Sequence, residues 1–212
     1  NPLTHAILHT CPIVVTASAF ERVLKTMSSA SIFFQGRLAL VTGGGSGIGR
    51  SVCHALAKEG CRVIVADINL DGAKATVESL PGTGHEALKV DVGESKSVTS
   101  LFENIAKLCS QPAGIVVNCA GLLIDPTPLV DLSKKDFDEI ILVNLKGTFL
   151  ITQAAARAMT AGSVRDGTIV NIASMAATKC NPGWSADAAS KAGVVALTKV
   201  AAKELASQGI RV

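Results

Sequence analysis

The chain has 212 residues, of which 48% are hydrophobic, and a formal net charge of +3. That length fits one domain of ordinary size, and the apolar content argues against disorder. The small, scattered charge, without a basic stripe or aromatic ladder, argues against a nucleic-acid partner, and no apolar run approaches the roughly 18–20 residues of a membrane span. The six cysteines form no CxxC pair and no metal-type spacing with the four histidines, so we expect no metal site and a reducing compartment.

Residues 1–34 differ in composition from the rest. Their only charged side chains are Glu21, Arg22 and Lys25, and they contain many Ser and Thr. They show neither a clear signal peptide nor an arginine-rich transit peptide. We expect a weakly structured N-terminal extension, or a mis-started chain in which Met27 is the true initiator. Peptides from residues 1–26 in the natural protein would contradict the second interpretation.

Strand and helix patterns alternate after residue 36. Strands are expected at residues 38–41, 62–67, 87–92, 114–119, 168–172 and from 210, and helices at 47–59, 70–80, 95–109, 133–159 and 186–207. The strands are continuous apolar runs, which are typical of a parallel sheet covered by helices on both faces. We therefore predict an α/β fold with a doubly wound parallel sheet of the Rossmann type, in one domain over residues 35–212.

A glycine-rich turn, TGGGSGIG at residues 42–49, joins the first predicted strand to the first helix. Glycines let the backbone come close to a pyrophosphate, and the helix N-terminus supplies free N–H groups and a positive dipole. The turn lacks the Lys-Ser/Thr of a P-loop, and taken alone it would more often be a flexible turn.

Asp67 ends the second strand, eighteen residues after Gly49. A Rossmann site places an acid there to bind the ribose hydroxyls of NAD. The alternative is that Asp67 caps the next helix, but the glycine-rich turn favours the ribose interpretation. A carboxylate would repel a 2′-phosphate, and no Arg or Lys lies in the turn or directly after Asp67. NAD is therefore predicted over NADP.

Five motifs in order resemble those of the short-chain dehydrogenases/reductases over residues 37–212. They are Thr42-Gly43-x-x-x-Gly47-Ile48-Gly49, Asp91-Val92, Asn118-Cys119-Ala120-Gly121, Val143-Asn144-Leu145-Lys146-Gly147 and Asn171-Ile172-Ala173-Ser174. Cys119 stands where the family has a second Asn. The segments VNLKGTFLITQAAA and AASKAGV are most similar to type 8 17β-hydroxysteroid dehydrogenases and 3-oxoacyl carrier-protein reductases.

The resemblance implies an NAD(H)-linked oxidoreductase that interconverts a secondary alcohol and a ketone, on a 3-hydroxyacyl thioester or a 17β-hydroxysteroid. It implies a homo- or hetero-tetramer located in the mitochondrial matrix or cytoplasm. The implied NAD contacts are Gly43, Ser46, Gly47, Ile48, Gly49, Asp67, Ile68, Asp91, Val92, Asn118, Ala120, Gly121 and Lys191. The implied catalytic positions are Asn144 (proton relay), Ser174 (substrate oxygen), Lys191 and position 187. Without these roles, Asn144 would be a buried amide that needs partners and Ser174 a hydroxyl bonded to backbone.

Position 187 is where the family has the Tyr of its Tyr-x-x-x-Lys motif, four residues before Lys191. Here it is Asp187, and the chain contains no tyrosine. We expect the Lys191 ammonium to lower the pKa of Asp187 below about 3.9, which leaves no proton to donate near pH 7. The charge also opposes a developing oxyanion. Losing general acid–base catalysis costs roughly 10²–10⁴ in rate, so we expect crippled catalysis. Alternatively, Asp187 stabilises its helix through the dipole and an i,i+4 ion pair with Lys191.

The family continues beyond the position of Val212 with a substrate-covering segment and a final strand. We therefore expect this chain to be C-terminally truncated relative to the family, without part of the substrate pocket and of the subunit interface. Restoring Tyr at position 187 should then restore activity only if that part is supplied. Two alternatives stay open: a non-catalytic NAD-binding partner subunit of a heteromeric reductase, or an aberrant truncated product.

Overall fold

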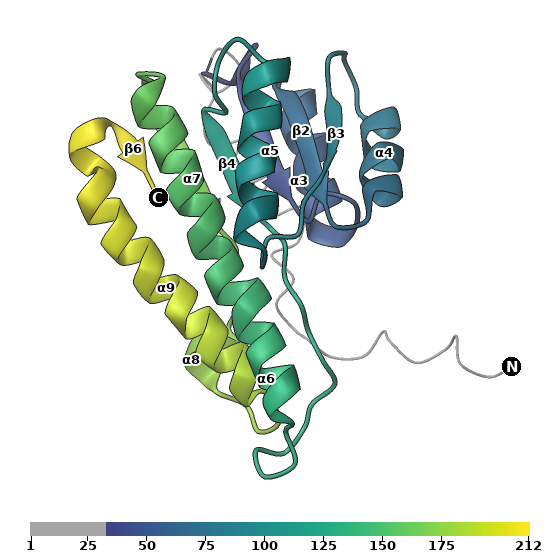
Figure 1. The fold of residues 1–212 in the computed structure, drawn as a ribbon, viewed down its shortest axis with the longest axis vertical. Coiled ribbons are helices and arrows are strands. Elements are labelled where there is room, and N and C mark those ends of the chain that lie inside the picture. Colours follow the sequence, from purple (N-terminus) through teal and green to yellow (C-terminus); the bar gives the residue numbers. More distant parts are fainter. Residues whose placement is uncertain (1–32) are drawn as a thin grey trace, which may run out of the picture.

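Six short strands form one parallel sheet (Figure 1). The structure is a computed structural model that describes residues 33–212, so the predictions for residues 1–32, including Met27 as initiator, lie outside the described residues. The strands are β1 (Leu38–Thr42), β2 (Arg62–Asp67), β3 (Glu86–Lys89), β4 (Ile115–Asn118), β5 (Gly167–Asn171) and β6 (Ile210–Arg211). Their order in the sheet is β3-β2-β1-β4-β5-β6. The predicted doubly wound parallel sheet is confirmed.

Helices connect the strands and cover both faces of the sheet. They are α3 (Gly47–Lys58), α4 (Leu70–Ser79), α5 (Ser95–Leu108), α6 (Lys134–Ile140), α7 (Thr148–Ala161), α8 (Ala176–Lys179) and α9 (Ser185–Leu205), with a π-helical turn at Ile141–Gly147 and a 3₁₀ turn at Ala206–Gln208. Figure 1 shows α7 and α9 side by side. In the part of the chain that the structure describes, no helix combines the length and the apolar character that crossing a bilayer requires.

Alternate residues of the central strands divide the core into two layers. Leu38 and Leu40 of β1 pack with α5 and α7 on one face, whereas Ala39 and Val41 pack with α3 and α4 on the other. All five residues of β1 are buried. A continuous apolar run is therefore what a strand covered on both faces requires.

Three local features differ from the prediction. The expected helix over residues 133–159 is interrupted by the π-helical turn Ile141–Gly147. Strand β3 ends at Lys89, so Asp91 and Val92 lie in the loop after it. The four-residue helix α8 was not predicted. A π turn inside a helix is rare and often accompanies a functional site.

Strand β1 has β2 on one side and β4 on the other, so the connections leave it in opposite directions. This reversal of strand order opens a crevice at the carboxyl ends of β1 and β4. The glycine-rich turn and the Asn118–Gly121 segment both begin at those ends. The topology therefore brings together two of the predicted motifs.

Candidate functional site

At two glycines of the glycine-rich turn, neighbouring backbone lies too close for a side chain. Gly43 has φ +65°, and a Cβ there would lie 2.7 Å from the backbone nitrogen of Ala120. A Cβ at Gly49 would lie 2.1 Å from the carbonyl oxygen of Gly43. Helix α3 then begins at Gly47, and the side chain of its N-cap residue Ser46 makes no capping hydrogen bond. The first turn of α3 therefore offers N–H groups that an anion can bind.

A cavity of about 420 Å³ lies at this turn. Eleven of the residues predicted to contact a cofactor line it: Gly43, Ser46, Gly47, Ile48, Gly49, Asp67, Ile68, Asp91, Val92, Ala120 and Gly121. Residues outside the predicted cofactor contacts also line it, among them Leu122, Glu139 and Val143. Val143 belongs to one of the five motifs, but nothing in the motifs indicates Leu122, in the loop after β4, or Glu139, in α6.

Asp67 holds the turn next to the end of β2. Its Oδ2 accepts a hydrogen bond from the Gly45 nitrogen at 2.8 Å, and its Oδ1 accepts one from the Asn69 nitrogen at 2.9 Å. Helix α4 is capped by Asn69, whose Oδ1 accepts from the Gly72 nitrogen at 3.1 Å. The alternative interpretation of Asp67 as the helix cap is therefore wrong. Its carboxylate instead faces the cavity and orders the turn.

Arg50 is a positive charge beside the turn that sequence reasoning missed. Its guanidinium donates to the carbonyl oxygen of Gly45 and, through Nε, to Oγ1 of Thr76 at 3.0 Å. The signal in the sequence was an arginine directly after the last glycine of the motif. The turn is thus flanked by the carboxylate of Asp67 and the guanidinium of Arg50.

Asn118 lies behind the cavity wall rather than in its lining. It is 4% exposed, and its Nδ2 donates to Oδ1 of Asn171 at 2.8 Å and to Oγ1 of Thr152 at 3.2 Å. Nδ2 of Asn171 in turn donates to Oγ1 of Thr198 at 2.9 Å. This network ties the carboxyl ends of β4 and β5 to α7 and α9. It positions the elements that carry the other site residues.

Asn144 fixes the loop after β4. It lies in the π-helical turn and is 1% exposed. Its Oδ1 accepts from the Leu122 nitrogen at 2.7 Å, and its Nδ2 donates to the Leu122 carbonyl at 3.0 Å. The buried amide has the partners that its burial requires. Asn144 therefore holds the segment at Gly121 and Leu122 against the cavity.

Asp187 and Lys191 lie one turn apart near the start of α9, where Asp187 is 7% exposed. The Nζ of Lys191 donates to the carbonyl of Ile172 at 2.9 Å. Within residues 33–212, the only side-chain ion pair is Arg211 with Asp166. The expected ion pair between Asp187 and Lys191 is therefore absent.

The expectation of a lowered pKa for Asp187 is also wrong. Burial raises the pKa of the Asp187 carboxyl, and this effect exceeds the opposite effect of Lys191. Burial likewise lowers the pKa of Lys191, while Asp187 and Cys119 act to raise it. The sequence showed the nearby ammonium but not the desolvation that outweighs it.

Ser174 and Cys119 complete this end of the site. Ser174 follows β5, and its Oγ accepts from the Ala176 nitrogen at 3.1 Å, in the turn that starts α8. Cys119 lines the cavity, and burial raises the pKa of its thiol to about 12. A thiol with that pKa stays protonated at neutral pH, so Cys119 is a small wall residue rather than a nucleophile.

Comparisons with known proteins assign the family. The family model described as short chain dehydrogenase matches residues 37–212, and the chain therefore belongs to this family. The (3R)-3-hydroxyacyl-CoA dehydrogenase of Homo sapiens is 45% identical over 183 residues, which cover 82% of this chain and 69% of the relative. A 3-oxoacyl-[acyl-carrier-protein] reductase of Thermotoga maritima is 38% identical, with 84% and 72% covered.

A solved structure shares both the fold and the sequence pattern. The crystal structure of 3-ketoacyl-(acyl-carrier-protein) reductase from Brucella melitensis complexed with NADH superposes with a TM-score of 0.80 at 30% identity. The match covers 84% of this chain and 74% of that one.

Proposed function

We propose that the chain is an NAD(H)-binding oxidoreductase of the short-chain type whose catalysis is crippled by Asp187. Membership of the family, together with the relatives' names, supports an oxidoreductase that acts on alcohol or hydroxyacyl substrates. The observation that carries the second part is the buried Asp187, one turn before Lys191 at the carboxyl end of the sheet. The family's Tyr would stand there.

The cavity at the glycine-rich turn fits a nicotinamide dinucleotide. The close backbone approach at Gly43 and Gly49 and the start of α3 suit a pyrophosphate. Asp67 would bind the adenosine ribose, and Asp91 with Val92 would contact the adenine. The NADH in the Brucella melitensis structure supports a nicotinamide cofactor, and Asp67 supports NAD over NADP.

The same residues indicate where the reaction would take place. A dinucleotide whose adenosine half lies at Asp67 extends across β1 towards the carboxyl ends of β4 and β5. There Lys191 would hold the second ribose and Ser174 the substrate oxygen. The bound cofactor would supply or accept a hydride. Asp187 would have to exchange the proton, but its side chain is shorter than that of the family's Tyr, and whenever its carboxyl is ionised it has no proton to give and repels the oxyanion that forms.

The substrate class follows from the relatives. The human and bacterial relatives are named for 3-hydroxyacyl-CoA and 3-oxoacyl carrier-protein substrates, so we propose a 3-hydroxyacyl or 3-oxoacyl thioester. A 17β-hydroxysteroid is the second candidate, from the motif resemblance. The domain over residues 35–212 would act in the mitochondrial matrix or cytoplasm.

A second candidate function is a non-catalytic NAD-binding subunit of a heteromeric reductase. The observation that favours it is an apolar groove of about 530 Å³ between α7 and α9. Phe149 and Val200 line it and are 41% and 53% exposed, which is high for large apolar side chains. We propose that this groove is covered in a tetramer, with copies of this chain or of an active relative.

One experiment separates these functions. NADH is titrated into the full chain by fluorescence, and turnover of a 3-oxoacyl thioester is then measured on the same sample. We expect binding with turnover at least about 10²-fold below that of an intact relative. Turnover at the rate of that relative would refute the crippled site, and absence of binding would refute the cofactor site. Co-purification of a second dehydrogenase chain would favour the subunit role.

A further inference from the structure

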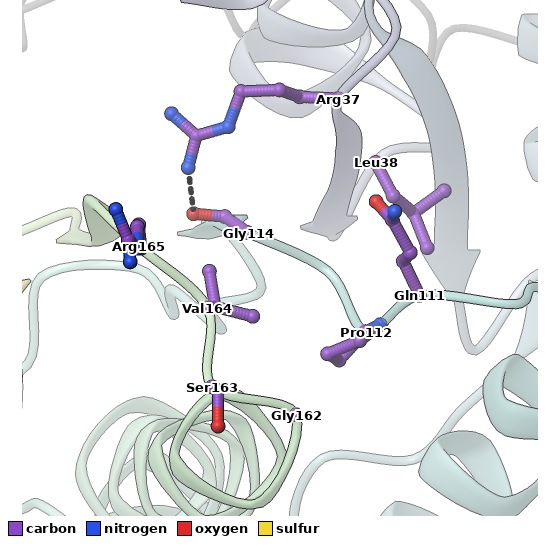
Figure 2. Close-up of a pocket in the computed structure, with 9 residues that line it drawn as sticks. All are labelled: Arg37, Leu38, Gln111, Pro112, Gly114, Gly162, Ser163, Val164 and Arg165. Atoms are coloured by element: carbon purple, nitrogen blue, oxygen red, sulfur yellow. Dashed lines mark hydrogen bonds between the residues drawn. The ribbon is translucent and has the colours of Figure 1, made fainter.

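A second cavity lies at the opposite end of the sheet from the glycine-rich turn. It measures about 290 Å³ and is found where β1, β4 and β5 begin (Figure 2). Its lining residues are Arg37, Leu38, Gln111, Pro112, Gly114, Gly162, Ser163, Val164 and Arg165. Among these are two arginines and no carboxylate. The proposed nucleotide site makes no use of this cavity.

Arg37 is held rigidly on one side of the cavity. Its Nη2 donates to the carbonyls of Gly114 at 3.0 Å and Asp166 at 2.9 Å, and its guanidinium lies 4.2 Å from the ring centre of Phe33. A guanidinium has five N–H donors, and both of these hydrogen bonds come from Nη2. Among the described residues, Nε and Nη1 of Arg37 have no acceptor. The side chain is therefore fixed in place with donors to spare.

The positive charge around this cavity is poorly compensated. Arg37 is within 4 Å of no carboxylate in residues 33–212, and burial lowers its pKa, an effect that Cys61 and Asp166 oppose. Asp166 also lies 4.0 Å from Arg211, whose guanidinium is 5.7 Å from the same Phe33 ring. Arg165 also lines the cavity, so its wall carries two guanidinium groups and no carboxylate.

We propose that this cavity binds a small phosphate ester. Guanidinium groups match the geometry of phosphate oxygens, and a dianion would balance the charges of Arg37 and Arg165 in the lining. Figure 2 shows the guanidinium groups of Arg37 and Arg165 on the same side of the cavity, with Leu38 and Pro112 across from them. The phosphate belongs beside the arginines, and these apolar side chains suit a small organic group.

Calorimetric titration of phenyl phosphate into the full chain tests the site. NADH is present at saturation, so that the glycine-rich turn is not available to the probe. We expect binding in the unmodified chain, and at least about tenfold weaker binding in Arg165→Gln, because hydrogen bonds to charged groups of this kind contribute that much. Arg37→Gln should weaken it as well, with thermal unfolding used to check that the protein stays folded.

Arg62→Gln is the matched control. Arg62 also begins a strand at this edge and donates to a backbone carbonyl, that of Gly84 at 3.2 Å, but it does not line the cavity. Its loss should leave the affinity for phenyl phosphate unchanged. Equal affinity in Arg165→Gln and the unmodified chain, or no binding at all, would overturn the proposal. A loss of affinity in Arg62→Gln equal to that in Arg165→Gln would also overturn the proposal, because the probe would then respond only to the overall positive charge.

Discussion

Lys191 lies one helical turn after Asp187, yet its ammonium bonds to the carbonyl of Ile172 at 2.9 Å instead of pairing with that carboxylate. The amine is thereby held at the end of β5, while no hydrogen bond reaches the Asp187 side chain within the described part of the chain. Asp187 is nevertheless 7% exposed. A charge placed near a carboxyl group that is buried and unpaired in this way interacts with it strongly, because little solvent and no partner screens it.

The first prediction concerns the redox state of the cofactor that Asp187 favours. The oxidised nicotinamide ring is positive and the reduced ring is neutral. An ionised Asp187 should therefore favour NAD⁺, by on the order of 1 kcal/mol or about fivefold. Asp187→Asn should weaken NAD⁺ binding by this factor and leave NADH affinity nearly unchanged, as measured by calorimetry. An equal change for both cofactors would contradict the charge argument.

The second prediction concerns the pH dependence of stability. Because the folded pKa of Asp187 is raised, the folded state holds more protons than the unfolded state above about pH 4. The contribution of Asp187 to the free energy of unfolding therefore falls as the pH rises from its unfolded pKa through its folded pKa. Lys191→Met removes the ammonium that limits the shift, so its free energy of unfolding should fall more than that of the unmodified chain as the pH rises above the unfolded pKa of Asp187. We expect an extra loss of about 1 kcal/mol in urea titrations.

Lys199→Met controls for the loss of a lysine from α9. Lys199 is exposed on the same helix and makes no ion pair within residues 33–212. Its substitution should leave the pH dependence as it is in the unmodified chain. The titration of Lys191 has the opposite effect. Because its folded pKa is lowered, the free energy of unfolding rises as the pH rises towards the unfolded pKa of 10.5. Identical pH dependence in Lys191→Met and Lys199→Met would contradict the prediction.

The sheet could be predicted from the sequence because the patterns that indicate its strands are local. The buried strands are apolar runs of four to six residues, and turns or helices separate them. The glycine-rich turn was readable for the same reason, since strand, glycines and helix are contiguous. The π-helical turn Ile141–Gly147 was not, because Asn144 adopts it while bonding to Leu122, 22 residues away.

The site was less predictable wherever tertiary contacts compete with local ones. The i,i+4 spacing of Asp187 and Lys191 predicts an ion pair, but the carbonyl of Ile172 lies closer once β5 and α9 have packed. The direction of the pKa shift of Asp187 depends on burial, which spacing does not show. Arg37 reaches the carbonyl of Asp166 across 129 positions, and no local pattern indicates that contact.

The third prediction compares two glycines of the turn. A Cβ at Gly49 would overlap the Gly43 carbonyl at 2.1 Å, so Gly49→Ala must displace backbone. We expect a loss of about 3 kcal/mol in unfolding free energy together with the loss of NADH binding. At Gly47, where φ is +49° and a Cβ meets open space, the substitution should cost only about 1 kcal/mol. Equal effects on NADH fluorescence would argue against a close backbone fit at Gly49.

The fourth prediction concerns the choice between NAD and NADP. Asp67→Ser removes the carboxylate that would repel a 2′-phosphate, and the guanidinium of Arg50 remains beside the turn. We expect NADH to bind about tenfold more weakly and the ratio of NADPH to NADH affinity to rise. Asp71→Ser, on the exposed start of α4, should leave both affinities unchanged. A fixed ratio in Asp67→Ser would mean that Asp67 does not select the cofactor.

The fifth prediction concerns assembly through the groove between α7 and α9. Val200 is 53% exposed there, and a charge at this position would have to be desolvated in any interface that covers the groove. We expect the unmodified chain to sediment as an oligomer and Val200→Glu as smaller species. Val130→Glu is the control, because Val130 is 91% exposed and lies outside the groove. A monomer in all three proteins would refute an interface at this face, whereas dissociation by Val130→Glu alone would place the interface elsewhere.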